Sequence, residues 1–535
     1  MTITSNPQVY DTTLRDGGQQ EGMNLSVADK LAIAAQLDQL GVGFIEGGWP
    51  GAIPKDTEFF RQAKTQLPLA HAVLVAFGST RKAGTDVAQD GQVAALLQAG
   101  TPAVTLVAKS DIRHVERALK TTGAENLQMI RDTVGYLVGK GRRVFLDCEH
   151  FFDGYRHDPA YTTDCVRAAH EAGAEAVVLC DTNGGMLPDR VEEVVAQVAA
   201  AVPGVHLGIH THNDSGCAVA NAMAALRAGA THVQGTMNGY GERTGNCDLA
   251  TVIANLELKC GVRALPEGKL GELTGVSHAI AEIANQAPAK RAPYVGDSAF
   301  AHKAGLHASA IRIDPDLYQH IDPLAVGNDM RMLVSEMAGR ATIELKAREL
   351  GFDLQGQPEV LARVVARVKS AEARGYTYDA ADASFELLLR EVVQGARPVY
   401  YETESWRAIA EQRGGTDSAL TEATVKVHAG QRRLVAVGEG NGPVNALDEA
   451  LRGALVAVYP ELADIELVDY KVRILDSSVG TGAVTRVLIE SARRGDSQGR
   501  VWRTVGVAAN IIEASWEALT DAIVYGLIHA GVEPR

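Results

Sequence analysis

"AVVLCDTNGGMLPDRVEEVVAQVAAAVPGVHLGIHTHND", residues 176–214, contains two β-rich runs separated by an amphipathic helical stretch. Each run ends in polar residues: Asp181 and Thr182 end the first, and His210 and His212 end the second. Residues i and i+2 of a strand face the same side, so the two histidines are expected to point in one direction. A strand, a helix and a second strand in this order indicate a parallel β-α-β unit.

The same alternation continues from residue 8 to about residue 260. Its helical stretches carry start and stop signals, as in "SVADKLAIAAQLDQLG", where Ser26 with Asp29 predicts an N-terminal cap and Gly41 predicts the helix end. Eight such pairs in roughly 250 residues indicate a (β/α)8 barrel, with a doubly wound open sheet as the alternative. The β-rich runs are "QVYDTTLRDG", "VGFIEGG", "HAVLVAFG", "AVTLVAKS", "RVFLDCEH", "AVVLCDTNG", "HLGIHTHND" and "HVQGTMNG".

Unusual polar residues gather at the ends of these runs, where barrel enzymes build their sites. If the barrel closes, only the eighth strand separates the first from the seventh, and their C-terminal residues converge. The residues at the run ends are Arg15, Asp16, Glu46, Lys109, Asp147, Glu149, Asp181, Thr182, His210, His212 and the segment 238–246.

Asp16, His210 and His212 are the candidate metal ligands, and Asn246 in "GYGERTGN" could add an amide oxygen. One carboxylate and two imidazoles suit a divalent ion such as Mg, Mn or Zn, with open positions for water and substrate. The alternative is structural: Asp16 as a turn former and the histidines as an exposed polar strand end.

Length and composition set wider limits on the protein. A chain of 535 residues with 46% apolar and 22% charged residues is typical of a globular protein of several domains. No apolar run approaches the ~18 residues of a membrane span, and no secretory signal is visible at the start, so we expect a cytoplasmic protein. A net charge of −15 argues against a nucleic-acid surface. The six cysteines form no C-x-x-C motif and are interpreted as reduced thiols.

The sequence divides into three expected domains: a barrel over residues 1–280, a helical linker domain over 281–395 and an α+β domain over 396–535. The last domain repeats itself weakly, because "AVGEGNGPVNALDEAL" from residue 436 and "TVGVAANIIEASWEAL" from residue 504 share a Gly, an Ala and a final E-A-L. This predicts a duplicated sheet-plus-helix unit, with chance similarity as the alternative.

"DTTLRDG" followed by Gln19, "HTHND" and "GERTGN" resemble the metal-dependent barrel acyltransferases, a family that includes 2-isopropylmalate, homocitrate and citramalate synthases. The likeness covers the whole chain: "AFAHKAGLHASAI" with "YQHIDPLAVGN" resembles the family's linker domain, and the tail resembles its regulatory domain. "FGSTRKAG" and "DCEHFFDGY" are most similar to the citramalate synthase subgroup.

The resemblance implies a Claisen condensation of acetyl-CoA with a 2-oxo acid. Arg15 would hold the oxygen that gains charge, and Gln19 and Thr182 match substrate-binding positions. Glu149, His307 and Tyr318 are the candidates for the base that removes the acetyl proton. In this family the linker domain reaches the neighbouring subunit's barrel, which implies a homodimer with a shared site.

Several of these residues also have a purely structural interpretation. Arg15 could merely pair with Glu46 or Glu149, and Thr182 could cap the helix of "LPDRVEEVV". The segment "HKAGLHASA" could be an amphipathic helix with incidental histidines.

Substrate choice depends on the space around the oxo-acid side chain, where one methylene is worth only ~1–3 kcal/mol. Phe77, Val107 and Asp147 are the expected walls, although the first two could equally be barrel core. A carboxylate at Asp147 would repel 2-oxoglutarate and disfavour an isopropyl group, which leaves pyruvate or 2-oxobutyrate. We therefore expect pyruvate as substrate and citramalate as product, with 2-isopropylmalate synthesis as the runner-up.

By the same resemblance, the tail would bind the end product of the pathway, with isoleucine as the first choice and leucine as the second. Two other functions are less well supported by the sequence. Lyases of the hydroxymethylglutaryl-CoA type carry a Cys in the glycine loop, where "NGYGERTGN" has none. A non-catalytic amino-acid sensor would not need Arg15, Asp16, Glu149, His210, His212 and His307 together.

Overall fold

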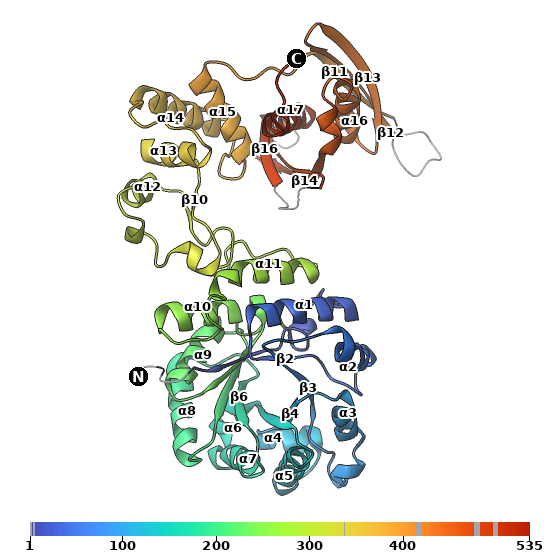
Figure 1. Ribbon diagram of the computed structural model, residues 1–535, viewed down its shortest axis with the longest axis vertical. Coiled ribbons are helices and arrows are strands. Elements are labelled where there is room, and N and C mark those ends of the chain that lie inside the picture. Colours follow the sequence, from blue (N-terminus) through green and yellow to red (C-terminus); the bar gives the residue numbers. More distant parts are fainter. Residues whose placement is uncertain (1–2, 4–5, 336, 412–419, 476–481, 496–500) are drawn as a thin grey trace. The chain divides into compact units, whose positions relative to one another are not determined.

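In the computed structural model, which describes residues 3, 6–335, 337–411, 420–475, 482–495 and 501–535, the chain divides into two compact units (Figure 1). The first comprises Met1–Phe300 with Ile321–Asp329, and the second Ala301–His320 with Met330–Arg535. These units do not match the three expected domains one to one, and the boundaries at residues 280 and 395 stay a prediction. No helix in the described ranges is long and apolar enough to cross a membrane. All six cysteines are free thiols.

The first unit contains a closed barrel of eight parallel strands in sequential order (Figure 1). Strand β1 pairs with β8 and closes it, with Gln8 opposite His232 and Asp11 opposite Gly235. The barrel prediction is confirmed, and the open sheet is wrong. The strands are β1 (Gln8–Asp11), β2 (Phe44–Glu46), β3 (Val73–Ser79), β4 (Ala103–Lys109), β5 (Arg143–Glu149), β6 (Ala176–Asp181), β7 (Leu207–Thr211) and β8 (His232–Gly235).

Helices surround the barrel and bury its outer face. The predicted signals act as expected in the first helix: the Ser26 hydroxyl accepts the Asp29 N–H, the Asp29 carboxylate accepts the Ser26 N–H, and Gly41 ends the helix at φ 95°. The helices are α1 (Val27–Leu40), α2 (Pro54–Gln66), α3 (Gly91–Ala99), α4 (Ile112–His114), α5 (Gly123–Gly139), α6 (Phe151–His157), α7 (Pro159–Glu171), α8 (Pro188–Ala201), α9 (Ala218–Arg227), α10 (Leu249–Lys259) and α11 (Leu273–Ile283).

The barrel interior has two chemically different ends. Near the strand starts, which we call the floor, a closed apolar cluster fills it. Its members are Tyr10, Phe44, Val75, Ala103, Phe145 and Ala176. Near the strand ends, which we call the mouth, several buried residues are polar: Asp16, Glu46, Asp147, His210, His212 and Gln234. Polar groups buried on this scale need partners or a ligand, so the mouth is where a site is expected.

The second unit begins with short strands and helices and ends in two similar halves. A two-stranded parallel sheet joins β9 (Ala301–His302) to β10 (Arg331–Met332). The helices of this region are α12 (Gly305–Ile311), α13 (Arg340–Glu349), α14 (Pro358–Ala373) and α15 (Asp382–Gln394). The last three pack on one another through a common apolar cluster, which agrees with the helical character expected for this stretch.

Each half that follows is a three-stranded antiparallel sheet with one helix (Figure 1). The matching glycines of the repeat, Gly438 and Gly506, lie where the helix backbone approaches the sheet, and a Cβ there would meet Ala450 N at 2.4 Å or Ala514 O at 1.9 Å. The expected duplication is therefore confirmed. The elements are β11 (Glu402–Glu411), β12 (Leu420–Ala429), β13 (Arg432–Gly440) and α16 (Pro443–Leu455), then β14 (Ile465–Ile474), β15 (Thr485–Arg493), β16 (Val501–Ala508) and α17 (Ile511–His529).

Candidate active site

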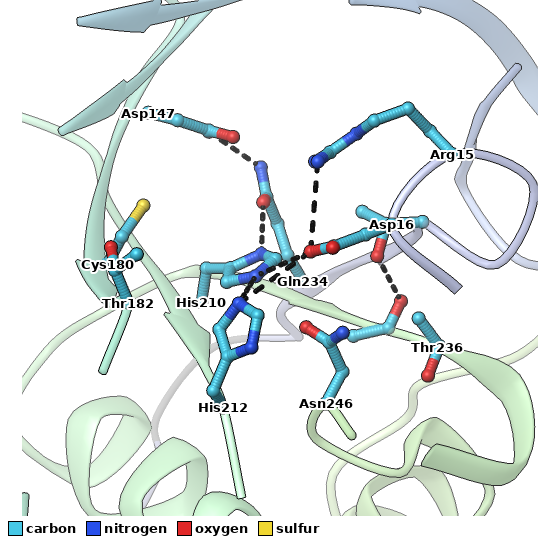
Figure 2. A network of polar contacts seen from close by, with 12 residues as sticks. Arg15, Asp16, Asp147, Cys180, Thr182, His210, His212, Gln234, Thr236 and Asn246 are labelled. Carbon is cyan, nitrogen blue, oxygen red and sulfur yellow. Dashed lines mark hydrogen bonds and ion pairs between the residues drawn. The ribbon is translucent and has the colours of Figure 1, made fainter. Parts of the chain in front are cut away.

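Asp16, His210 and His212 converge at the mouth of the barrel, as Figure 2 shows. The Nε2 atoms of His210 and His212 lie 3.1 and 3.8 Å from Asp16 Oδ2 and 3.3 Å from each other. Asp16 follows β1, while both histidines leave β7 on the same side because they are two residues apart. One atom from each of the three buried side chains lies within 4.8 Å of the others, so the set could hold a metal ion.

Asn246 lies beside this cluster. Its backbone forms an antiparallel bridge with His212, and its Nδ2 donates to the Tyr240 carbonyl over 3.1 Å. The Asn246 Oδ1 is buried and accepts no hydrogen bond from the described residues. An unsatisfied buried oxygen next to a carboxylate and two imidazoles fits a further ligand to the same ion.

The charges of the cluster also suit metal binding. Burial alone would raise the pKa of Asp16, but the charge of Arg15 and the hydrogen bond from His210 outweigh it and hold the pKa well below its usual range. Burial, helped by the neighbouring His210, lowers the pKa of His212 to about 4. Asp16 is therefore an anion and His212 a neutral imidazole near neutral pH, which are the protonation states that ligate metals.

A cavity of about 790 Å³ opens over the cluster. Among the residues predicted from the sequence, Glu46, Asp181 and Asn246 do not line it, whereas the other candidates for catalysis, substrate binding and metal binding in the barrel do. These candidates are Arg15, Asp16, Gln19, Phe77, Val107, Asp147, Glu149, Thr182, His210 and His212. The structure thus brings together residues from strands that are far apart in the sequence, as strand-end convergence predicts.

Arg15 is held on two sides in this cavity. Its Nε donates to Glu46 Oε1 over 2.5 Å, and its guanidinium carbon lies 3.9 Å from the centroid of the Phe77 ring. Its terminal nitrogen Nη1 also lies 3.8 Å from Asp16 Oδ2. The pairing with Glu46 considered from the sequence exists, and it orients Arg15 within the cavity rather than removing it from there. Phe77 therefore both lines the cavity and packs against Arg15.

Thr182 and Glu149 have specific partners. The Thr182 hydroxyl accepts the His150 N–H over 2.8 Å, while α8 begins after Leu187 and has no side-chain cap, so the capping alternative is wrong. The Glu149 carboxylate forms a close ion pair with Lys109. His150 sits at a positive φ of 58°, an uncommon conformation for a non-glycine residue that often marks functional sites.

Sequence reasoning missed Gln234, which lies on β8 between the site residues. Its Oε1 faces His210 Nδ1 at 2.9 Å, and its Nε2 donates to Asp147 Oδ1 over 3.0 Å. The available signal was weak: "HVQG" carries a long polar side chain within a strand that must be buried in any barrel.

His307 and Tyr318 belong to the second unit. His307 lies on α12, and its ring stacks on that of Tyr318 with the centroids 4.1 Å apart. Tyr318 is partly exposed. The two predicted residues are therefore brought together, and their catalytic role stays a prediction.

Comparison with known proteins gives a consistent result. Residues 6–280 match the HMGL-like family, residues 294–375 the homocitrate synthase post-HMGL domain-like family, and residues 379–527 the LeuA allosteric (dimerisation) domain. The (R)-citramalate synthase of Streptomyces coelicolor is 63% identical over 98% of this chain and 97% of its own length. The (R)-citramalate synthase of Synechocystis is 49% identical over 97% and 96%. Among solved structures, the HMG-CoA lyase of Bacillus subtilis aligns with 54% of this chain and 96% of its own, at 20% identity and a TM-score of 0.47.

Proposed function

This chain belongs to the family of the (R)-citramalate synthases, and on that premise we propose that it condenses acetyl-CoA with pyruvate and water to give (R)-citramalate and CoA. The observation that carries the proposal is the convergence of Asp16, His210 and His212 beside Arg15 in one cavity. We expect the reaction to take place in the cytoplasm.

Asp16, His210, His212 and Asn246 would hold a divalent ion, with Mg, Mn and Zn all compatible. When bound, such an ion polarises the ketone of a 2-oxo acid and stabilises negative charge on its oxygen. Arg15 would donate to the same oxygen as it gains charge, because Glu46 and Phe77 hold its guanidinium in place. Thr182 and Gln19 would bind the carboxylate of the oxo acid.

Condensation also needs a base at the acetyl methyl group. The base removes one proton, the resulting carbanion forms a carbon–carbon bond to the ketone carbon, and the ketone oxygen takes up a proton. Water then cleaves the thioester and releases CoA. Glu149, His307 and Tyr318 stay the candidates; Glu149 forms an ion pair with Lys109 in the cavity, whereas the last two would come from the partner in a homodimer.

The walls of the cavity support a small oxo acid. Phe77 and Val107 present apolar surface, and the buried Asp147 carboxylate lies among them. A methyl group fits such walls, while the second carboxylate of 2-oxoglutarate would meet Asp147. Synthesis of 2-isopropylmalate is the second candidate, since one or two extra methyl groups change binding by only ~1–3 kcal/mol each.

A thiol reagent that measures CoA release from acetyl-CoA tests the proposal. Pyruvate should give the highest kcat/KM among pyruvate, 2-oxobutyrate, 2-oxoisovalerate and 2-oxoglutarate. A clear preference for 2-oxoisovalerate would overturn the citramalate assignment and leave the acyltransferase class standing. No CoA release with any oxo acid, from protein supplied with Mg, Mn or Zn in turn, would overturn the class as well.

The second unit contains a cavity of about 690 Å³ between α16 and β14, one from each half of the duplicated domain. Its lining offers carboxylates at Asp448 and Glu449, guanidinium groups at Arg452 and Arg494, and apolar surface at Val444. This combination suits a zwitterionic amino acid with an aliphatic side chain, and we propose isoleucine as an inhibitor bound there, with leucine as the second choice.

Inhibition of this kind couples two sites and is tested by filling the cavity. Val456→Trp should abolish inhibition by isoleucine while uninhibited turnover stays the same, because Val456 lines only this cavity among those described. Unchanged inhibition of the variant would assign the effector to another surface. Leucine, run as a parallel titration, decides between the two amino acids.

A further inference from the structure

A chain of hydrogen bonds crosses the mouth of the barrel from β5 to β7 by way of β8 (Figure 2). Asp147 Oδ1 accepts from Gln234 Nε2 at 3.0 Å, and Gln234 Oε1 faces His210 Nδ1 at 2.9 Å. All three side chains are buried. We call this chain the mouth network.

The direction of the Gln234 amide follows from its partners. Gln234 Nε2 donates to Asp147 Oδ1, so the NH2 end of the amide lies at Asp147 and the carbonyl end is turned toward His210. An amide oxygen has no proton to give, and His210 Nδ1 must therefore carry the proton that they share. The nitrogen left to lose its proton is Nε2, which lies 3.1 Å from Asp16. A metal ion that replaces the proton between Nε2 and Asp16 would then bind the lone pair of Nε2.

A reversed amide would have the opposite effect. With the NH2 group toward His210, the Nδ1 atom would have to accept, and the proton of the neutral ring would move to Nε2. A protonated Nε2 cannot bind a metal ion, because ligation needs the free lone pair. The amide direction thus decides whether His210 is able to act as a ligand.

We infer that Gln234 is a positioning residue, locked in direction by Asp147, that keeps a proton on His210 Nδ1 and so leaves Nε2 as the nitrogen that can bind a metal ion. The inference rests on the metal site of the proposed function. It assigns Asp147 a task besides forming a wall of the substrate cavity.

The floor of the same barrel provides a matched control. There Gln8 Oε1 faces His232 Nδ1 at 3.1 Å, and Gln8 Nε2 donates to Glu175 Oε1 over 3.2 Å. We call this chain the floor network. It repeats the order carboxylate, glutamine, histidine, at the strand starts, away from the residues that line the cavity at the mouth.

The test measures Mn²⁺ binding to the metal-free full-length protein, by electron paramagnetic resonance of the free ion. Gln234→Met keeps the length of the side chain and removes both hydrogen bonds, and it should weaken Mn²⁺ binding about 10- to 100-fold, as the loss of such supporting partners does. Gln8→Met, the same change in the floor network, should bind Mn²⁺ like the wild type. Circular dichroism melting checks that both variants fold.

A double variant separates tautomer control from mere packing. In Gln234→Glu with Asp147→Asn, the Asn amide can donate to the new carboxylate, which still accepts the His210 Nδ1 proton. Mn²⁺ affinity should then return to within a few-fold of wild type, above that of Gln234→Met.

Wild-type affinity in a folded Gln234→Met protein would overturn the role of Gln234 and leave the metal site intact, provided that Asp16→Ala abolishes binding. An affinity of the double variant as low as that of Gln234→Met would overturn the tautomer argument. Absence of saturable Mn²⁺ binding by the wild type would overturn the metal site, and this inference with it.

Discussion

The mouth network and the floor network have the same order of groups and opposite surroundings. In the floor network, His232 lies among the rings of Tyr10, Phe44 and Phe145, with centroids 5.1 to 6.2 Å away, and its Nε2 is buried without a hydrogen-bond partner in the described chain. In the mouth network, the Nε2 of His210 faces Asp16. Both glutamines fix the same tautomer, and the neighbours of Nε2 decide what the ring can do.

The protonation of the two histidines reflects this difference. Burial lowers the pKa of His232 to about 3, although the charge of Glu175 opposes the shift. Burial acts in the same direction on His210, but the hydrogen bond and charge of Asp16 outweigh it and raise the pKa. A polar residue inside a barrel is therefore a structural element or a site component according to the charges that surround it, and its own type does not distinguish the two.

The largest expected effect is loss of activity at the mouth. His212→Ala should lower kcat/KM by at least about 10³-fold, because it would remove one of the four proposed ligands of an ion that supplies several kcal/mol of charge stabilisation. The free energy of unfolding should change little or rise, since the lost ring is desolvated and its Nδ1 makes no hydrogen bond with the described residues.

Turnover assays and urea unfolding of the same preparation measure both quantities. His232→Ala in the floor network is the matched variant, and its folded fraction should keep wild-type kcat/KM. Full turnover by His212→Ala after chelation of metal would contradict the metal-binding role that distinguishes the mouth from the floor.

The second effect lies at the floor and is one of stability. Phe145 is fully buried and packs edge-on against Tyr10 and Phe44, with centroids 5.6 and 5.1 Å away. Phe145→Ala should lower the free energy of unfolding by about 3–5 kcal/mol, through lost apolar burial and the cavity left behind. Activity per folded molecule should stay near wild type, as urea titration combined with active-site-normalised turnover would measure. A fall in kcat larger than the loss of folded protein would mean that the floor takes part in catalysis.

The barrel could be predicted because its signal is local and repeated. Each β-rich run and each helix cap can be recognised from a few neighbouring residues. Closure of the eight-stranded barrel then brings Asp16 and His210 together without further information. Gln234 could not be predicted, because its meaning depends on Asp147, 87 residues away in the sequence. Thr182 was ambiguous for a similar reason: its hydroxyl accepts from His150, 32 residues earlier, rather than from the helix that follows it.

A third effect, smaller than the first two, concerns the charge geometry of Arg15. Arg15→Lys keeps the positive charge but cannot donate to Glu46 and to a substrate oxygen from a planar group at the same time. We expect kcat to fall about 10²- to 10³-fold, the usual cost of losing one donor to a developing oxyanion, with a smaller change in KM. Steady-state kinetics with pyruvate measures this, with Arg142→Lys, whose guanidinium donates to the Thr101 carbonyl, as a control of equal chemistry. An equal loss of kcat in both variants would mean that Arg15 has no specific role in the reaction.

The smallest expected effect is a pH dependence of the free energy of unfolding that comes from His232 in the floor network. The pKa of His232 is about 3 in the folded protein and about 6.5 in an unfolded chain. Between these values the unfolded state binds more protons, so the stability contributed by the neutral ring is present above pH 6.5 and is lost as the pH falls toward 3. From pH 7 to pH 5 the loss from this group is on the order of 2 kcal/mol.

His232→Phe removes the titrating group and keeps a ring among the three aromatic side chains, so its stability should fall less than that of the wild type over the same interval. Urea unfolding of both proteins at pH 7 and pH 5 measures the difference, in which the other titrating groups cancel because the two proteins share them. The same change would be uninformative at the mouth, where the hydrogen bond and charge of Asp16 raise the pKa of His210 and replacement of the ring would also remove a proposed metal ligand. Equal pH dependence of the two proteins would mean that His232 titrates normally within the fold, and the contrast between a neutral floor histidine and a charged mouth would be lost.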